Sequence, residues 1–230
     1  MGQSESTATP PGITTDGVDD TSALIDAHTE ALQSTSVTVT ATQTMQNTDP
    51  DFTVSTNRTW RLNGSPPVRG RLVRTLSTSG AAPDQYRATP NRVVAYRNGS
   101  TTIKRVTTTN GSSTSHVDLL NSSVRLNGAL HRSTIYELTT RETATVDPVT
   151  HNGTTLYRVS AALNDTGIRS NASLTLFVTP EGVVRELRTA QTVRYRSGPR
   201  RITRRVRFSD VGTTTVERPQ WASPTVETRN

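Results

Sequence analysis

Apolar and polar residues alternate over most of this chain, which is the pattern of β-strands. Between Ser36 and Phe208, short runs place an aliphatic or aromatic residue at every second position, with Thr or Arg in between. Because successive side chains of a strand point to opposite faces, these runs predict a sheet with one buried and one wet face. Turn signals such as Asn98-Gly99 and Asn110-Gly111 separate the runs. We therefore expect about ten antiparallel strands linked as a meander.

Two segments depart from this pattern. From Asp19 and Asp20 to Ser34, apolar residues recur at helical spacing, and the two carboxylates stand where a helix dipole favours negative charge. Residues 113–132 have irregular spacing and predict one or two short helices or a crossing segment. A sheet of many long strands curls as it twists, so the N-terminal helix should cover part of its concave face.

The expected fold is therefore mainly β with one or more helices (α+β). It is a curved antiparallel half-barrel with the N-terminal helix packed on the concave face. Residues 1–18 are polar and contain Pro10-Pro11-Gly12, which predicts a flexible leader. Residues 19–222 form a single half-barrel domain in this interpretation, and residues 223–230 a flexible tail.

A curled sheet with a helix across its mouth can enclose a cavity for a lipid or other apolar ligand. The sequence leaves a second arrangement open, in which sheet and helix close on their own side chains. The same inward positions would serve either arrangement. These candidate ligand-binding residues are Leu24, Ala31, Val39, Phe52, Val54, Trp60, Leu174, Leu176, Tyr195 and Val206.

Composition indicates an exported protein without a transmembrane helix. Apolar residues make up 31% of the chain, and no stretch approaches the roughly 20 consecutive apolar residues that a spanning helix needs. Eight of the 12 Asn lie in N-x-[ST] triplets, where roughly three or four would arise by chance. The excess favours a glycoprotein; the alternative is Asn-Gly turns that happen to precede Thr-rich strands. The candidate glycosylation sites are Asn57, Asn98, Asn110, Asn121, Asn152, Asn164 and Asn171.

Charge is distributed unevenly along the chain. The net charge is +7, yet no Lys or Arg precedes Arg58, and 25 of the 26 basic residues are Arg. In the last strand, three Arg alternate with apolar residues and should point to the polar face of the sheet. Arg204 instead falls at a position of the apolar face, where it would meet an inward carboxylate or a ligand head group. The candidate residues for an anionic partner or head group are Arg194, Arg196, Arg201, Arg204, Arg205 and Arg207.

The ladder of like charges is compatible with a solvated surface or with an anionic membrane surface. Nucleic acid is not expected as a partner, because aromatic residues do not interleave with the Arg side chains on that face. We also expect no enzyme activity, cofactor or metal. The chain has no Cys, no G-x-S-x-G motif and no Gly-rich phosphate loop, and its four His are not at metal-ligand spacing. Carboxylates converging from separate strands would be the remaining route to catalysis.

Three stretches resemble a known family. The opening Pro10–Thr14, the helix Ser22–Leu32 with the Thr/Val strand after it, and the close at Phe208–Gly212 through Trp221 resemble haloarchaeal surface lipoproteins of uncharacterised function. Those proteins are similar in architecture to the LolA-like and LppX-like lipoprotein carrier superfamily, in which a curved half-barrel and helices enclose acyl chains. The resemblance implies an archaeal, halophilic source and lipid binding.

The resemblance also implies a lipid anchor on the outer face of the cytoplasmic membrane. The chain departs from the family in being basic and in lacking the lipidated Cys. Gly2-Gln3-Ser4 would suit the positions after such a Cys, with Met1 in its place. The expected function is lipid or apolar ligand binding by a cell-surface lipoprotein; the alternative is a glycosylated structural or adhesion module without a ligand. No oligomeric state follows from these residues.

Overall fold

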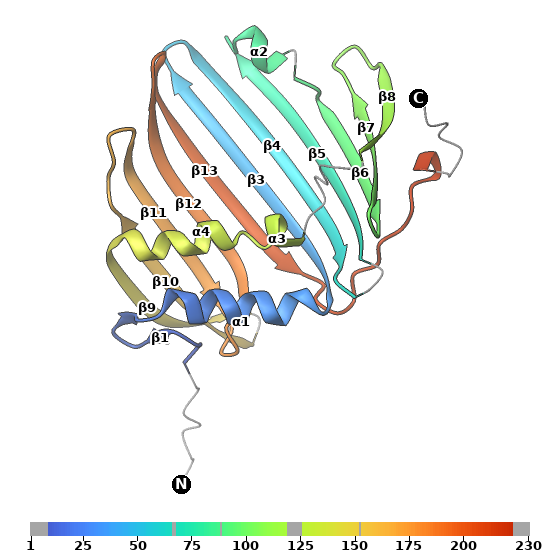
Figure 1. Cartoon of the computed structure of the whole chain (residues 1–230). Helices are drawn as coiled ribbons and strands as arrows, with labels where there is room; N and C mark the ends of the chain where they lie inside the picture. The colour runs from blue at the N-terminus through green and yellow to red at the C-terminus, as the bar shows by residue number, and fades with distance from the viewer. Residues whose placement is uncertain (1–8, 66–67, 88, 119–125, 152, 223–230) are drawn as a thin grey trace.

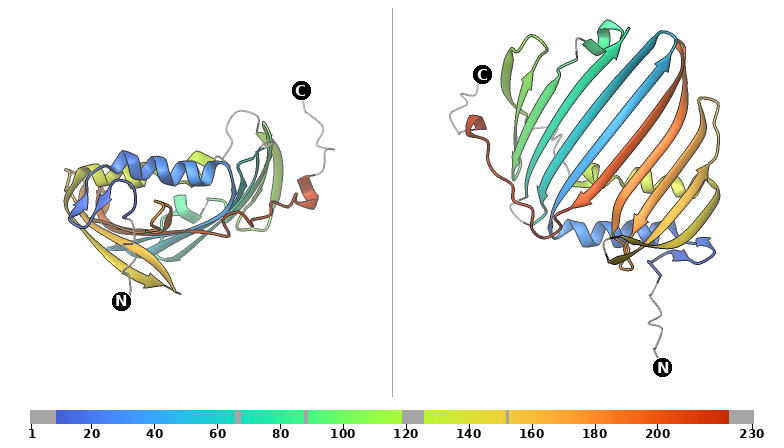
Figure 2. Two further views of the ribbon diagram at one scale, coloured as in Figure 1. Left: turned by 90° about the horizontal axis from the view of Figure 1, so that it is seen from below. Right: turned by 180° about the vertical axis from the view of Figure 1, so that it is seen from behind.

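A curved sheet of eleven antiparallel strands forms the body of the protein (Figure 1). This computed structural model describes residues 9–65, 68–87, 89–118, 126–151 and 153–222. The helices α1 and α4 lie across the concave face of the sheet (Figures 1 and 2). The expected α+β half-barrel is therefore confirmed. None of the helices in the described ranges is long and apolar enough to cross a membrane.

Strands and short helices follow one another along the chain from Ile13 to Ala222. They are β1 (Ile13–Thr14), β2 (Gly17–Val18), α1 (Thr21–Gln33), β3 (Ser36–Thr48), β4 (Asp51–Asn63), β5 (Arg69–Gly80), α2 (Asp84–Arg87), β6 (Arg92–Asn98), β7 (Thr101–Thr107), β8 (Ser113–Asp118), α3 (Leu126–Ala129), α4 (Arg132–Tyr136), η1 (Glu137–Thr140), β9 (Arg141–His151), β10 (Thr154–Leu163), β11 (Arg169–Val178), β12 (Val184–Tyr195), β13 (Gly198–Ser209) and η2 (Gln220–Ala222).

The sheet consists of two meanders that meet in its middle. Strands β3 to β8 lead outward to one edge, and after the crossing segment that carries α3 and α4, strands β9 to β13 lead back from the other edge. The last strand pairs with the first, so that Val206 of β13 lies opposite Ala41 of β3. The prediction of one continuous meander is therefore wrong at this junction. Periodicity identifies strands but does not specify which of them pair across the chain.

Helix α1 begins where the sequence predicts because Asp20 caps it. Its Oδ1 accepts hydrogen bonds from the backbone N–H groups of Ser22 at 2.9 Å and Ala23 at 3.0 Å. The helix then turns Leu24 and Leu32 onto the sheet, and both are fully buried. Its apolar stripe therefore covers the concave face as expected.

The described part of the predicted leader is ordered, which corrects the expectation of a flexible segment from 1 to 18. Strands β1 and β2 pair as a hairpin that places Ile13 against Val18. Both side chains are buried in the main core. Burial of two aliphatic side chains offsets the entropy lost on ordering so short a hairpin. Residues 1–8 and the predicted tail 223–230 lie outside the described residues.

A buried histidine connects α1 to the crossing segment and the sheet. The Nε2 of His28 donates to the Leu130 carbonyl at 3.2 Å, and its Nδ1 accepts from the Val184 N–H at 3.2 Å. The ring also meets Phe208 edge-on, with centroids 4.9 Å apart. Burial lowers the pKa of His28 to about 4, and the hydrogen bond to Leu130 opposes this only in part. The ring is therefore neutral at pH 7, as both of its contacts require.

We expect the protein to lose stability in mild acid through His28. Its pKa is about 4 in the folded state and near 6.5 when unfolded, so the unfolded chain binds more protons between these values. The free energy of unfolding should fall as the pH drops from 6.5 to 4, by on the order of 3 kcal/mol for this group. Urea titrations at pH 7 and pH 4.5 measure the change. Both measurements are made on the His131→Gln variant, because the pKa of His131 is also lowered to about 4 and its protonation would change stability over the same range. Replacing the exposed His116 with Gln as well should leave the change unaltered, and an equal stability at both pH values would contradict the prediction.

Candidate functional site

Most of the predicted cavity residues form a closed core. Phe52 and Val54 belong instead to a second cluster with Met45 at the far ends of β3 and β4. Ala31 is exposed on α1 and does not line the interior, because it lies outside the buried stripe of that helix. Tyr195 is 41% exposed, and the guanidinium of Arg200 lies 4.4 Å from its ring centroid. The residues that belong to the main core are Leu24, Val39, Trp60, Leu174, Leu176 and Val206.

A small hollow lies beneath α4 and η1. Thr134 and Glu137 from these elements, with Gln191 and Arg204 from the sheet, border a space of about 120 Å³. Pockets for ligands usually begin near 300 Å³, so this hollow is too small for an acyl chain. In the described part of the chain, α1 and α4 thus pack on the sheet through their own side chains, an arrangement that the sequence left open.

Only part of the concave face lies beneath the two helices. Figures 1 and 2 show α1 and α4 over the side of the sheet formed by β9 to β13. On the other side, Leu72 of β5 and Ala95 of β6 are buried with Ala129 and Leu130 in the main core, and the face becomes more exposed towards α2. Leu76 of β5 and Val106 of β7 are half-buried there. Beyond them, beside α2, Leu76 and Tyr86 border an open surface hollow of about 610 Å³ with a mixed lining. Its other lining residues are Ser77, Thr78, Ser79, Gly80, Arg87, Asn91 and Thr109.

A row of basic side chains crosses the concave face between the two apolar clusters. Arg204 lies on β13, Arg58 on β4 and Arg74 on β5, and we call these three residues the concave basic belt. Arg204 is opposite Gln43 of β3, and Arg58 is opposite Arg74. The side chain of each points to the face of the sheet that carries the core residues. Arg58, for example, points to the same face as Trp60. The belt therefore interrupts what would otherwise be a continuous apolar floor.

The belt has no carboxylate partner among the ion pairs of the described residues. Arg204 donates from Nε and Nη2 to the Gln43 side-chain oxygen, at 3.1 and 2.7 Å. Arg74 reaches only the Pro90 carbonyl, at 3.5 Å, and its Nε is buried without a partner. Burial first, and then repulsion by Arg204 and Arg74, lowers the pKa of Arg58. Like charges placed opposite each other destabilise a sheet, so the belt is unfavourable for folding.

His131 stands beside the belt at the start of α4. Its backbone is left-handed, with φ of 54°, and its ring meets Trp60 edge-on at a centroid distance of 6.1 Å. Burial lowers the pKa of His131 to about 4, with further contributions from the charges of Arg204 and Arg58. Its Nε2 is buried without a hydrogen-bond partner. A neutral imidazole nitrogen therefore lies near the charges of Arg204 and Arg58.

The sequence predicted Arg204 of this belt but missed Arg58 and Arg74. The structure places Arg204 on the concave face, where it meets an amide rather than a carboxylate. Arg74 falls between Leu72 and Leu76 at the buried parity of β5, and Arg58 has the same parity as Trp60. Their position in the alternation could have placed both residues on the buried face from the sequence alone. Only the pairing of the strands shows that the three arginines are neighbours.

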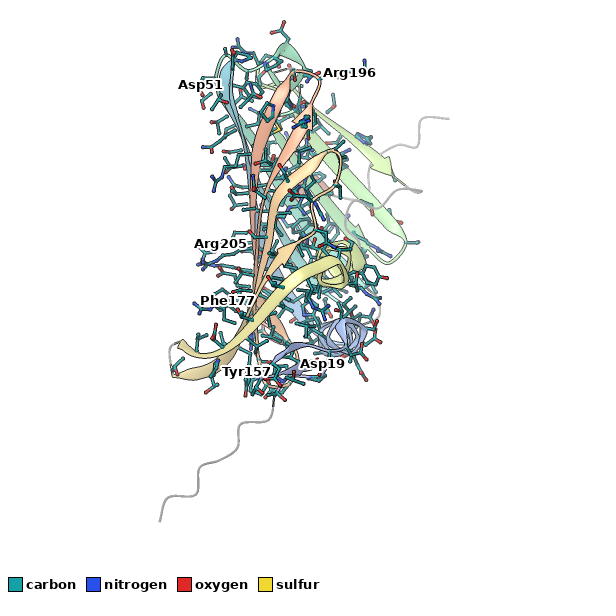
Figure 3. All side chains as sticks on the ribbon, turned by 90° about the vertical axis from the view of Figure 1, so that its left-hand side faces the viewer. Asp19, Asp51, Tyr157, Phe177, Arg196 and Arg205 are labelled. Carbon is teal, nitrogen blue, oxygen red and sulfur yellow. The ribbon has the colours of Figure 1, made fainter. Side chains whose placement is uncertain are left out.

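The predicted arginine ladder lies on the opposite, convex face. Figure 3 shows Arg205 and Phe177 projecting from the side of the sheet away from α1. Glu186 accepts hydrogen bonds from Arg205 at 2.8 and 2.9 Å, from Arg207 at 2.9 Å, and from Arg188. The remaining predicted residues are exposed towards the other end of these strands. They are Arg194, Arg196 and Arg201.

Glu186 relieves much of the repulsion that this ladder would otherwise cause. Burial of the carboxyl group opposes its ionisation, but hydrogen bonds from Arg205, Arg188 and Arg207 outweigh burial and lower the pKa of Glu186 to about 2. The convex face therefore holds its arginines around an internal carboxylate, whereas the concave belt has none facing it in the described part of the chain.

We expect the substitution Glu186→Gln to destabilise the fold by about 1–2 kcal/mol at pH 7, because three arginines would lose their common anion. Chemical unfolding of both proteins measures the difference. The wild type should lose this contribution between pH 4.5 and pH 2, since the folded carboxyl group has the lower pKa. Replacing the exposed Glu217 with Gln provides the control, and an equal effect of both substitutions would refute a special role for Glu186.

Most predicted glycosylation sites lie on the surface. Asn57 is exposed in the middle of β4 on the convex face, and the other described sites are exposed in or beside turns. These positions are Asn98, Asn110, Asn164 and Asn171. Asn121 and Asn152 lie outside the described residues. Within the described ranges, no group of three His, Asp or Glu residues is placed to hold a metal ion.

Neither a protein-family model nor a curated protein sequence matches this chain. Several solved structures resemble it in fold. A chain of the Pseudomonas aeruginosa MucA/MucB complex is 13% identical, with a TM-score of 0.40 over 86% of this chain, which spans 59% of that one. A DUF1329 family protein from Desulfovibrio piger is 9% identical, with a TM-score of 0.30, 89% of this chain and 96% of that chain being covered.

A third solved structure is a putative outer membrane lipoprotein-sorting protein domain from Vibrio parahaemolyticus. It is 10% identical to this chain, with a TM-score of 0.28, and the match covers 86% of this chain and 95% of that one. All three TM-scores are below 0.5, so these structures carry no argument about the ligand or partner of this chain.

Proposed function

We propose that this chain is the ligand-binding domain of an exported, membrane-anchored lipoprotein, and that it binds a lipid or similar amphiphile on its concave face. The observation that carries the proposal is the concave basic belt, which lies between two apolar clusters on one surface. An amphiphile offers the same combination of apolar and polar groups. Export, glycosylation and anchoring rest on the sequence, and no catalytic role is part of the proposal.

The belt is difficult to explain as a packing device. A floor that only closed against α1 and α4 would be most stable if its polar row were apolar, since half-burying cations that have no anion beside them is unfavourable. Instead three strands each place an arginine between core residues, and the nitrogens Arg74 Nε and His131 Nε2 are left without partners. Groups of this kind, held at a cost in stability, are typical of sites that are completed by a ligand.

The end of the concave face beside α2 offers a place for an apolar tail. From the belt, Arg74 is followed on the same face of β5 by Leu76, which borders the hollow of about 610 Å³ beside α2. Tyr86 provides a second apolar surface there. A tail on this path does not enter the closed core under α1, so binding requires no displacement of that helix.

The closed core favours one other function. A half-barrel that is filled by its own side chains, with Leu24 and Leu176 fully buried, is also what a structural or adhesion module without a ligand would have. In that case the Thr-rich convex face would be the surface that mediates adhesion or assembly.

Native mass spectrometry of protein purified from its own source, followed by organic extraction, separates the two functions. We expect a stoichiometric adduct that is lost on extraction. The substitution Leu76→Gln should lower its occupancy several-fold by making the tail path polar, whereas Val73→Gln, on the opposite face of the same strand, should not. A bare mass that persists after incubation with vesicles of the organism's lipids would refute the proposal and support the structural module.

A further inference from the structure

We infer that the ligand carries a phosphate-type oxyanion and that the concave basic belt, together with His131, is the site that binds it. This inference rests on the proposed function and specifies the chemistry of the head group. It follows from the geometry, the charge and the unused hydrogen-bonding groups of the belt.

The belt crosses the sheet obliquely, because Arg204 lies in the row of Gln43, two residues along the strands from the row of Arg58 and Arg74. It extends over the four adjacent strands β13, β3, β4 and β5, and neighbouring strands are about 4.8 Å apart, so the outer two are separated by roughly 14 Å. Arginine side chains are long enough to converge across that width. Gln43, on the strand between Arg204 and Arg58, holds the Arg204 guanidinium through two hydrogen bonds to one oxygen. One member of the belt is therefore already oriented.

The charge of the belt selects the class of anion. Arg58, Arg74 and Arg204 carry three positive charges, and no ion pair of the described residues includes them. A single carboxylate would leave most of this charge in place, whereas a phosphate or sulfate group offers more acceptor oxygens and, as a phosphate monoester, up to two negative charges. Guanidinium groups are suited to such oxyanions because they can donate two parallel hydrogen bonds.

His131 contributes a neutral donor next to this charge. Its Nε2 is buried without a partner, while its ring is fixed edge-on to Trp60. As neutral imidazole, the ring can donate one hydrogen bond from Nε2 without adding a fourth positive charge. The left-handed backbone of His131, with φ of 54°, is the kind of strain that collects at ligand sites.

Calorimetric titration of the delipidated protein with inorganic phosphate and with sulfate, at constant ionic strength in chloride, tests the site directly. We expect saturable binding that Arg58→Gln or Arg74→Gln weakens by about tenfold or more. Arg61→Gln is the matched control, since Arg61 lies on the same strand as Arg58 but is exposed on the convex face. Absence of binding to the wild type, or equal weakening by Arg61→Gln, would overturn the inference.

Thermal unfolding provides a readout that a merely structural arginine would not produce. Without ligand, Arg58→Gln should melt at a higher temperature than the wild type, because it removes a cation from between two others. Phosphate should raise the Tm of the wild type and raise that of Arg58→Gln much less at the same concentration. A lower Tm of the ligand-free variant would assign Arg58 to the support of the fold and count against the site.

Vesicles distinguish a lipid head group from a free anion. After incubation with phosphatidylcholine alone, or with phosphatidylcholine containing phosphatidic acid, native mass spectrometry should detect transfer of phosphatidic acid to the wild type and much less to Arg58→Gln. Phosphate binding without any lipid transfer or native lipid adduct would refute the proposed function but support the anion site. A native lipid adduct retained at full occupancy by Arg58→Gln would support the proposed function but refute the anion site.

Discussion

The antiparallel pairing of β13 with β3 is the interaction on which the other features of the structure rest. It joins the meander β3–β8 to the meander β9–β13 and so makes one curved sheet from two. Without it, neither half offers α1 a continuous surface, since the main core draws residues such as Val39 from one half and Leu176 from the other. The same pairing sets Arg204 beside Gln43, and so beside the strands that carry Arg58 and Arg74. Fold and candidate site therefore share one structural cause.

The two faces of the sheet differ in whether their arginine side chains have a carboxylate partner. On the convex face, Arg188, Arg205 and Arg207 surround Glu186, and the cluster is internally satisfied. On the concave face, Arg58 and Arg74 face each other with no carboxylate between them in the described structure. A neutralised cluster stabilises the fold, whereas one that lacks its anion stores unfavourable energy that a ligand can relieve. This contrast favours binding on the concave face.

The closed core restricts how an amphiphile can bind. Leu24 of α1 and Leu176 of β11 are fully buried, and the hollow beneath α4 is only about 120 Å³. An acyl chain enclosed under the helices would require them to separate from the sheet, with loss of the His28 hydrogen bonds. A ligand held across the belt, with its tail towards α2, leaves that core intact. The molecule is thus better suited to present an amphiphile on its surface than to engulf one.

Periodicity and capping are local properties of the chain, so the strands, the helix capped by Asp20 and the inward parity of Arg204 could all be predicted from the sequence. Two features could not be predicted in this way, because they depend on contacts between distant segments: the pairing of β13 with β3, and the ordering of the predicted leader by Ile13 and Val18. Arg58 and Arg74 had the buried parity in the sequence, yet strand pairing alone made them neighbours of Arg204. A site on a sheet is assembled across strands rather than along one, and the sequence does not encode that order in any local pattern.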